Sequence, residues 1–236
     1  MKSKYLFLSL VCLFALIGGI VIGSQFYQAQ HIILKVKTPE APDTAPYFRV
    51  VNREKDFYVS NELMKVKPSL PSNETALKIV KKFMLKKGGI PEDAELAKVE
   101  RVMLKALNVK TGEIIRQKPL FVSVKYKREL NGAPVIGPGD EIEFAVANDI
   151  LYYSKKWSIL EYAGNVNIIS AKEGLKLLER GSIVNKPMSI AFPLTVSDIK
   201  LGYYSDGKRN YYYPVWIFYC KDNLGNDLKL AVKAIK

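Results

Sequence analysis

The longest hydrophobic feature of the chain is an uncharged run near its start, residues 5–23, preceded by Lys2 and Lys4. A helix rises about 1.5 Å per residue, so this run matches the roughly 30 Å hydrocarbon core of a bilayer. It has no polar face, and it exceeds the apolar stretch of about 7–15 residues that is typical of cleaved signal peptides. We therefore predict a transmembrane anchor at residues 5–23 after a cytoplasmic tail, residues 1–4. A cleaved signal peptide and a buried core helix stay open as alternatives.

The segment after the anchor lacks apolar periodicity. Residues 38–46 contain three prolines, which favour a semi-extended chain. We expect residues 24–46 to form a juxtamembrane linker and regular structure to begin near Tyr47. Because a long domain that follows a short N-terminal tail is normally translocated, we place this domain outside the cytoplasm, with the protein in the cell membrane as a single-pass chain.

Two segments have the periodicity of helices. The first follows Pro71 and ends at Gly88-Gly89. Its apolar residues recur at helical spacing on one face: Ala76, Leu77, Ile79, Val80, Phe83 and Met84. The second begins at residues 170–173, where serine and glutamate three positions apart form a capping box, and ends at residue 181.

Most of the remaining chain alternates between apolar and polar residues in short runs bounded by turn residues, which is typical of strands. These runs are residues 96–109, 113–127, 141–146, 189–201, 211–220 and 227–235. The order of helix, strands, helix and strands predicts an α+β fold of two similar units, each an antiparallel sheet packed against one helix. We place the first unit at residues 47–165 and the second at residues 166–236.

Charge then narrows the range of partners. The chain has 36 basic and 23 acidic residues, a net charge of +13, which favours anionic partners. The basic residues are scattered among acidic ones, without an arginine-rich or aromatic nucleic-acid signature, so we expect no nucleic acid. Anionic lipid and wall polymers are candidate contacts, homo-oligomerisation stays open, and a charge that only maintains solubility is the alternative.

Part of the second half resembles a known family. Residues 128–137 carry the pattern basic–x–x–Asn–Gly–x–Pro–Val–x–Gly, which is similar to the strand-turn-strand of PepSY-type domains. Residues 199–203 and 213–216 resemble the closing strands of membrane-anchored regulators of cell-wall sensor kinases, the YycH and YycI type. The resemblance extends over residues 126–234 and implies a non-enzymatic regulatory or binding module on a single-pass anchor. The PepSY-type relatives include protease propeptides, but no protease domain follows here.

Few residues stand out as candidates for contacts. Tyr211, Tyr213 and Trp216 lie in a run that is apolar on both faces, so it is either a buried strand or an aromatic surface that receives a partner. Asn73 opens a glycosylation sequon at the start of the first helix, where it is also a candidate cap. Gly19 and Gly23 form a G-x-x-x-G pair suited to helix packing in the membrane.

Catalytic and metal-binding signatures are weak. The single histidine, His31, excludes Ser-His and Cys-His pairs and histidine-rich metal sites, and we predict no catalytic residue, metal or cofactor. The two cysteines, Cys12 and Cys220, cannot pair within one chain if Cys12 lies in the membrane; Cys220 is expected in the core. Residues 197–200 and 110–112 match S-x-x-K and K-T-G in the wrong order, so we interpret them as a strand and a turn. Asp140, Glu141 and Glu143 are expected to be solvated charges.

We expect a binding module that regulates an envelope protein such as a sensor kinase or a protease, as part of a two-component system in the first case. The alternatives are a structural or assembly component of a cell-surface complex and an unrecognised enzyme.

Overall fold

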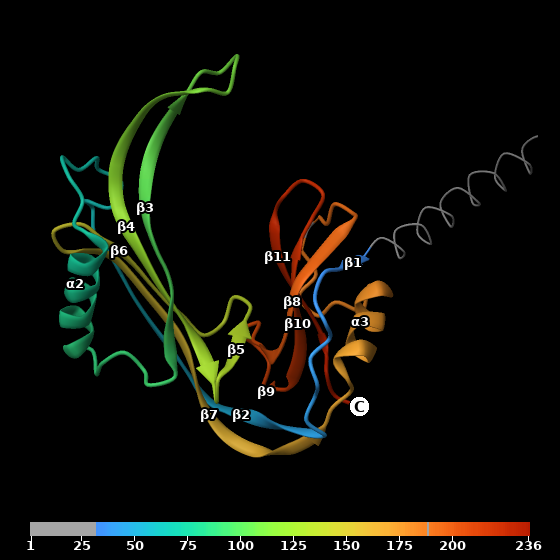
Figure 1. The fold of residues 1–236 in the computed structure, drawn as a ribbon. Coiled ribbons are helices and arrows are strands. Elements are labelled where there is room, and N and C mark those ends of the chain that lie inside the picture. The colour runs from blue at the N-terminus through green and yellow to red at the C-terminus, as the bar shows by residue number, and fades with distance from the viewer. Residues whose placement is uncertain (1–31, 188) are drawn as a thin grey trace, which may run out of the picture. The chain divides into compact units, whose positions relative to one another are not determined.

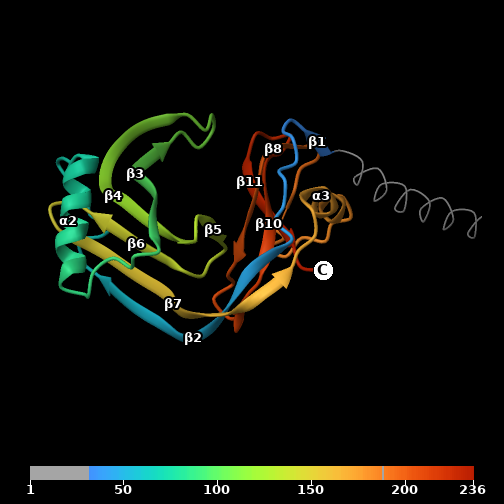
Figure 2. The same cartoon turned by 60° about the horizontal axis from the view of Figure 1, so that its bottom comes forward.

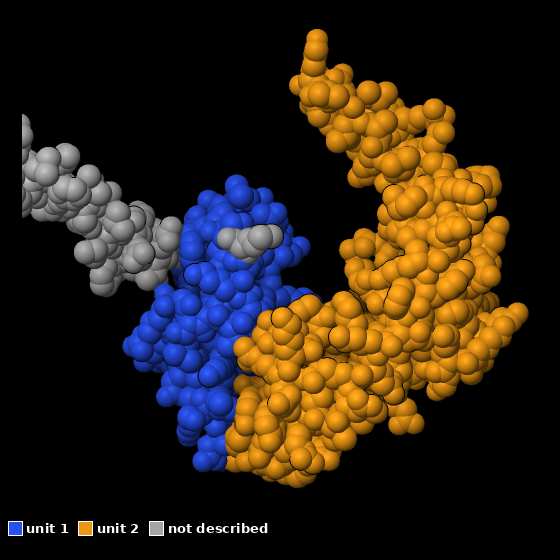
Figure 3. Space-filling view, turned by 180° about the vertical axis from the view of Figure 1, so that it is seen from behind, with its two compact units in different colours: residues 1–43, 167–200, 215–236 blue, residues 44–166, 201–214 orange. Residues whose placement is uncertain are grey.

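The computed structural model describes residues 32–187 and 189–236, which form two compact units. Unit 1 comprises the described residues up to Asp43 together with Asn167–Lys200 and Val215–Lys236, and unit 2 comprises Thr44–Val166 and Leu201–Pro214. Figure 3 shows these parts of the chain in different colours. Strand β8, Leu194–Tyr204, contributes its first residues to unit 1 and its last residues to unit 2.

Unit 2 is built on a sheet of long, bent strands (Figures 1 and 2). Hydrogen-bonded neighbours follow the order β4, β6, β7, β2 and β9, and β3 pairs with β4 on its other edge. The bounds are β2 Thr44–Val59, β3 Ala94–Leu107, β4 Ile114–Leu130, β6 Glu141–Val146, β7 Ile150–Asn167 and β9 Tyr211–Tyr212. The short strand β5, Ala133–Ile136, forms a hairpin with the end of β4 and pairs in parallel with Tyr203 and Tyr204 of β8.

One face of this sheet packs against helix α2, Asn73–Leu85. The Ser72 hydroxyl accepts a hydrogen bond from the Thr75 amide, so Ser72 caps the helix and Asn73 is its first helical residue. Apolar side chains of the helix meet alternate residues of β4 and β6, which point to the same face, and three residues of β7. The fully or nearly fully buried members of this core are Ala76, Val80, Met84, Val122, Val124, Tyr126, Ile142, Phe144, Val146, Ile150, Tyr153 and Trp157.

The opposite face of the same strands carries charges of alternating sign. Glu95 lies opposite Lys127, Lys127 opposite Glu141, and Glu141 opposite Lys156. The Lys127–Glu141 ion pair is 2.6 Å long. Each cross-strand pair contributes less than about 1 kcal/mol, but a shift of one residue would reverse the faces, so the ladder supports this register.

Unit 1 contains a smaller sheet in the order β11, β10, β8 and β1, with helix α3 beside it (Figure 1). The bounds are β1 Ile32–Leu34, β10 Pro214–Lys221, β11 Asp227–Lys233 and α3 Ala171–Glu179. Strand β1 pairs in parallel with the start of β8, whereas β10 and β11 are antiparallel. The capping box of Ser170 and Glu173 is present as predicted.

Gly174 allows α3 to approach the sheet of unit 1 closely. A Cβ atom on Gly174 would lie 2.8 Å from Cδ1 of Trp216, which is 1% exposed. The Trp216 indole Nε1 donates a hydrogen bond of 3.0 Å to the Ile169 carbonyl, which fixes the ring.

The predicted fold class, two similar units that each pair an antiparallel sheet with one helix, is wrong. The described chain is mostly β, with eleven strands and two helices, and the sheets of the two units differ in strand number and length. The parallel pairings of β1 and β5 with β8 are incompatible with purely antiparallel sheets. The prediction failed because β2 and β7, 16 and 18 residues long, carry charged residues that interrupt simple alternation.

Several predicted features of the N-terminal region lie outside the described residues. These are the tail, the anchor at residues 5–23, Cys12, His31, Gly19 and Gly23. Among residues 32–187 and 189–236, no helix is long and apolar enough to cross a bilayer. The described part of the expected linker contributes β1 and the first residues of β2.

Candidate functional site

A buried polar network lies in unit 2, at the turn between β5 and β6. Asp140 ends the sequence Gly137-Pro138-Gly139-Asp140 and has a φ of 50°, a left-handed conformation that directs it inward. The turn packs tightly, since a Cβ atom on Gly139 would lie 2.2 Å from the Ser205 hydroxyl. The expectation that Asp140 is solvated is therefore wrong, because its side chain is fully buried.

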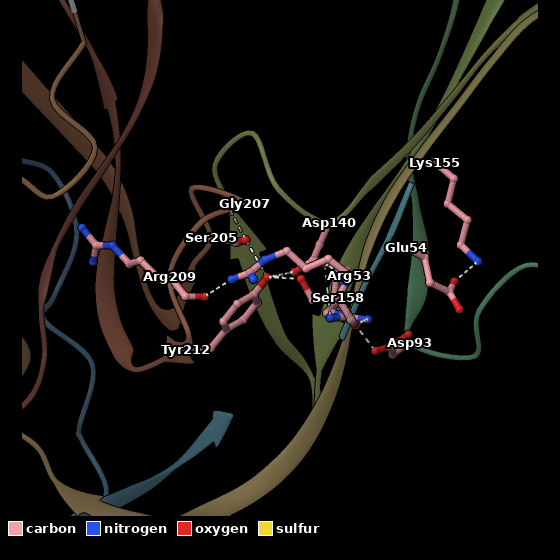
Figure 4. A network of polar contacts seen from close by, with 11 residues as sticks. Arg53, Glu54, Asp93, Asp140, Lys155, Ser158, Ser205, Gly207, Arg209 and Tyr212 are labelled. Atoms are coloured by element: carbon pink, nitrogen blue, oxygen red, sulfur yellow. Dashed lines mark hydrogen bonds and ion pairs between the residues drawn. The ribbon is translucent and has the colours of Figure 1, made fainter. Parts of the chain in front are cut away.

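The Asp140 carboxylate accepts hydrogen bonds from two strands (Figure 4). The Ser158 amide donates to Oδ1 at 2.7 Å, and the Tyr212 hydroxyl donates to Oδ2 through a short bond. The Tyr212 hydroxyl also lies 2.9 Å from the Ser158 hydroxyl and 2.6 Å from the Ser205 hydroxyl. Burial raises the pKa of Tyr212 to about 12, and the Asp140 charge adds to the effect. The network thus connects β7, β9 and the turn.

Arg128, at the end of β4, balances the charge of this network. Its side chain is 3% exposed and lies 3.3 Å from Asp140 and 2.8 Å from Asp93. Nη2 donates to the Ser158 carbonyl, and the guanidinium lies 4.4 Å from the centre of the Trp157 ring. Nε and Nη1 have ion-pair contacts but no aligned hydrogen bond. Removing one acid would leave part of a buried charge uncompensated.

A pocket of about 400 Å³ opens beside Arg128. The Lys155–Glu54 ion pair, 2.6 Å long, contributes both of its residues to the lining. The lining is otherwise largely apolar and comes from β2, β4, β7 and the segment after α2. Its residues are Phe48, Glu54, Pro91, Asp93, Arg128, Leu130, Lys155, Trp157, Ser158, Ile159, Leu160 and Tyr162.

A second feature of unit 2 is a cluster of three tyrosines, Tyr47, Tyr211 and Tyr213, called here the tyrosine cluster. The rings of Tyr47 and Tyr213 stack with centroids 5.2 Å apart, and those of Tyr211 and Tyr213 stack at 5.8 Å. Tyr211 and Tyr213 are each 40% exposed. Gly164 lies next to Tyr47, where a Cβ atom would approach the ring to 3.1 Å.

The pairing of β2 with β9 explains why the cluster forms. Arg49 lies opposite Tyr211, and Phe48 lies opposite Tyr212. Alternation therefore directs Tyr211 to the face of Tyr47 and Arg49, whereas Tyr212 points to the buried network. Arg49 also forms an ion pair with Glu161, with Nε 2.7 Å from the carboxylate.

The structure brings together two of the three predicted contact residues. Tyr211 and Tyr213 share the cluster, but Trp216 is buried in unit 1 against Gly174. The sequence suggested Tyr211 and Tyr213 through their apolar run; it missed Tyr47, which lies at the expected start of regular structure. Arg128 carried a signal only within the family pattern.

The remaining candidates are placed as follows. Asn73 is exposed at the start of α2, where Ser72 supplies the cap. Cys220 is buried and free, and burial raises its pKa to about 12. The Ser197 hydroxyl donates to the Tyr219 carbonyl, and Lys110 lies in the turn between β3 and β4. Within the part of the chain that the structure describes, no group of three or more His, Cys, Asp or Glu side chains is arranged to hold a metal ion.

Comparisons with known proteins add little. No family model matches this chain, and no curated protein matches it. The chain is similar to a crystal structure of an uncharacterized protein from Eubacterium rectale, with 16% sequence identity and a TM-score of 0.38. The similarity covers 72% of this chain and 55% of that protein, so the chain spans little more than half its length. The resemblance to PepSY-type domains and to the YycH and YycI type has no support from a family match and stays a prediction.

Proposed function

We propose that this chain is a non-enzymatic binding module, anchored in the cell membrane by residues 5–23, which regulates an envelope protein from outside the cytoplasm. A sensor kinase or a protease is the class of partner that we favour. The observation that carries the proposal is the tyrosine cluster in unit 2, in which the exposed rings of Tyr211 and Tyr213 stack on each other and Tyr213 stacks on the half-buried ring of Tyr47.

The cluster suits a protein partner for two reasons. Tyrosine is enriched at the energetic centres of protein interfaces, since it offers a large apolar ring and a polar hydroxyl. The rings of Tyr47, Tyr211 and Tyr213 already restrain one another, so binding would order them at little further cost in entropy. The exposed pair of Arg49, on β2, and Glu161, on the neighbouring strand β7, would supply polar contacts at the edge.

The buried network supports binding over catalysis. Its hydroxyl groups belong to Ser158, Ser205 and Tyr212, which are at most 3% exposed and hydrogen-bond to one another or to Asp140. A nucleophile must reach its substrate, and an activated hydroxyl needs a base that is free to take its proton. A phenol whose pKa is raised to about 12 is also a weak acid at neutral pH.

The pocket is a less favourable contact surface than the cluster. Its buried cation, Arg128, already lies between two carboxylates, those of Asp93 and Asp140, so it offers little net charge to an anionic ligand. Lys155 is likewise paired with Glu54.

Site-specific photo-crosslinking of the full-length protein in its native membrane tests the proposal. A photoreactive residue at Tyr213 should capture an envelope protein that the same residue at Tyr58 does not capture. Tyr58 is a matched control, because it is 46% exposed and lies on β2, the strand that carries Tyr47. Tyr213→Ala should weaken capture about thirtyfold, the effect of losing about 2 kcal/mol at an interface hot spot, and Tyr58→Ala should not.

The anchor is tested by replacing residues 5–23 with a plain leucine helix. Loss of capture on this exchange, in a protein that still reaches the membrane, would support regulation through the anchor. Capture of copies of this chain alone would favour a structural role instead. Equal capture from positions 213 and 58 would contradict the proposed surface.

A further inference from the structure

The β3–β4 hairpin extends beyond the rest of unit 2 (Figures 1 and 3). Only residues 122–127 of β4 pair with β6, and the Pro119 carbonyl accepts a hydrogen bond from the Lys67 amide. Farther out, β3 and β4 pair only with each other among the described strands. We call residues 104–118 the hairpin end.

The hairpin end exposes an unusual amount of aliphatic surface. Val109 is 99% exposed, Ile115 70% and Leu107 52%, and Leu104 and Ile114 are nearly half exposed. A two-stranded ribbon is marginally stable in water, and exposed apolar patches commonly mark interaction sites.

These aliphatic side chains point to both faces of the ribbon. Ile114 and Ile115 are consecutive in β4 and therefore project to opposite sides. Leu107 lies opposite Ile114 and shares its face, while Val109 lies in the turn. A partner that covered one face would leave the other in water, whereas a medium that surrounds the tip would cover both.

The hairpin end is also basic. Its four basic residues, Lys105, Lys110, Arg116 and Lys118, outnumber the single acidic residue, Glu113, so its net charge is +3. Basic side chains occur on both faces, because Lys105 lies opposite Gln117 and Arg116 is the next residue. In an anionic membrane, the basic side chains would contact the negative head groups, and the aliphatic side chains would contact the boundary of the acyl chains.

We propose that the hairpin end inserts into the surface of an anionic lipid bilayer. Leu107 and Ile114 flank the turn of residues 108–113 and lie three to four residues from its apex at Lys110 and Thr111, at most about 12 Å along an extended chain. A hairpin that lies at an angle to the bilayer surface would bring Leu107, Val109 and Ile114 within the roughly 5–10 Å to which interfacial apolar faces are buried. Lys105, Arg116 and Lys118 lie farther from the apex, at the level of the head groups, and Lys110, at the apex, would extend its ammonium group back toward them.

Two other occupants fit the hairpin less well. Strand addition at the free edge of β3 is hindered by register shifts after Leu96, Val102 and Ala106, which interrupt the ladder. Two copies of the hairpin end would repel each other, because each has a net charge of +3.

The test uses the full chain reconstituted into vesicles, with an environment-sensitive fluorophore at Val109→Cys and, as a control, at Leu224→Cys. Leu224 is 74% exposed and lies in unit 1. Of the two native cysteines, Cys220 is buried, and Cys12 is replaced by serine in both labelled variants. With phosphatidylcholine containing about one third phosphatidylglycerol, the fluorophore at position 109 should shift to the blue and be quenched by spin-labelled lipid. The fluorophore at position 224 should remain in water.

Charge and insertion are separated by replacing the four basic residues with glutamine. In the anionic vesicles, the ratio of inserted to water-exposed hairpin end should fall about fivefold for each replacement. Insertion of the native hairpin end should also be weaker in pure phosphatidylcholine than in the anionic vesicles. Quenching that is absent, or equal in the two lipids, would overturn the proposal. In native membranes, a photoreactive residue at position 109 that crosslinks to an acidic protein and not to lipid would overturn it too. The tyrosine cluster is not involved, so Tyr213→Ala should leave insertion unchanged even if it abolishes partner capture.

Discussion

At the scale of single residues, neighbouring tyrosines of β9 have opposite surroundings. Tyr212 donates its hydroxyl proton to buried Asp140, whereas Tyr211 is 40% exposed in the tyrosine cluster. Because the strand alternates, one position separates a residue that holds unit 2 together from a residue that is free to contact a partner.

Tyr212→Phe removes one hydroxyl from this network and leaves Asp140 Oδ2 without its donor. We expect a loss of about 1–3 kcal/mol in the free energy of unfolding, since a buried acceptor becomes unsatisfied. Urea denaturation followed by circular dichroism measures the change. The matched variant Tyr211→Phe should stay within about 0.5 kcal/mol of the native protein. Equal effects at positions 211 and 212 would refute the structural role of the network.

Much less of the network than of the cluster could be predicted from the sequence. Tyr211 and Tyr213 were identified because their run is apolar and aromatic. Asp140 follows Pro138-Gly139, a pattern that normally indicates a solvated turn, and only tertiary contacts with Arg128 and Tyr212 direct it inward. Tyr47 was missed because it joins the cluster through pairing between β2 and β9, strands that are far apart in the chain.

At the scale of elements, the helices were predictable and the long strands were not. Both helices combine a cap, an apolar face and a glycine near the end, signals that are local in sequence. Strands β2 and β7 depend on neighbours for their length, and the parallel pairing of β1 with β8 joins residues 32–34 to residues 194–196. Local periodicity contains no information about such a partner.

The contact of α3 with β10 predicts the effect of Gly174→Ala on stability. Helix propensity favours alanine by about 1 kcal/mol, but its Cβ would lie 2.8 Å from Trp216, a ring fixed by burial and by its hydrogen bond to Ile169. Overpacking of this kind costs about 1–3 kcal/mol, so we expect a net loss of about 1 kcal/mol in unfolding free energy, measured by urea denaturation.

Two comparisons separate packing from propensity at this site. Lys172→Ala, at an exposed position of α3, should change the stability by less than about 0.5 kcal/mol. In a Trp216→Phe background, Gly174→Ala should cost less than in the native protein, because the ring that it meets is smaller. A stabilising effect in the native background would show that the helix can shift freely.

At the scale of the whole molecule, each unit gathers segments from distant parts of the chain. Unit 2 includes Leu201–Pro214 as well as Thr44–Val166, and the later segment supplies Ser205, Tyr212 and two members of the tyrosine cluster. The proposed binding surface therefore forms only when Leu201–Pro214 packs against the earlier segment of unit 2. Assembly from such distant segments is also why two consecutive, similar units could not account for the fold.

The buried phenols predict how unit 2 responds to alkali. Burial raises the pKa of Tyr153, Tyr203 and Tyr212 to about 12, and all three belong to unit 2. The pKa of tyrosine in an unfolded chain is about 10, so the folded chain holds these protons more tightly. Their contribution to stability is therefore fully present below about pH 10 and is lost as the pH rises through about 12.

The two tryptophans allow each unit to be followed separately, because Trp157 lies in unit 2 and Trp216 in unit 1. In Trp216→Phe, the fluorescence of Trp157 should show a urea midpoint that falls steeply between about pH 9 and about pH 11.5. In Trp157→Phe, Trp216 should report a smaller decrease, because the buried Cys220, with its pKa raised to about 12, is the unit 1 group with a comparable upward shift among the described residues. Adding Tyr212→Phe to the first variant should flatten its pH dependence, whereas Tyr211→Phe should not. If the pH dependence of the urea midpoint were unchanged by Tyr212→Phe, ionisation of the Tyr212 phenol would not destabilise unit 2. Its hydrogen bond to Asp140 would then not be what holds β9 in place.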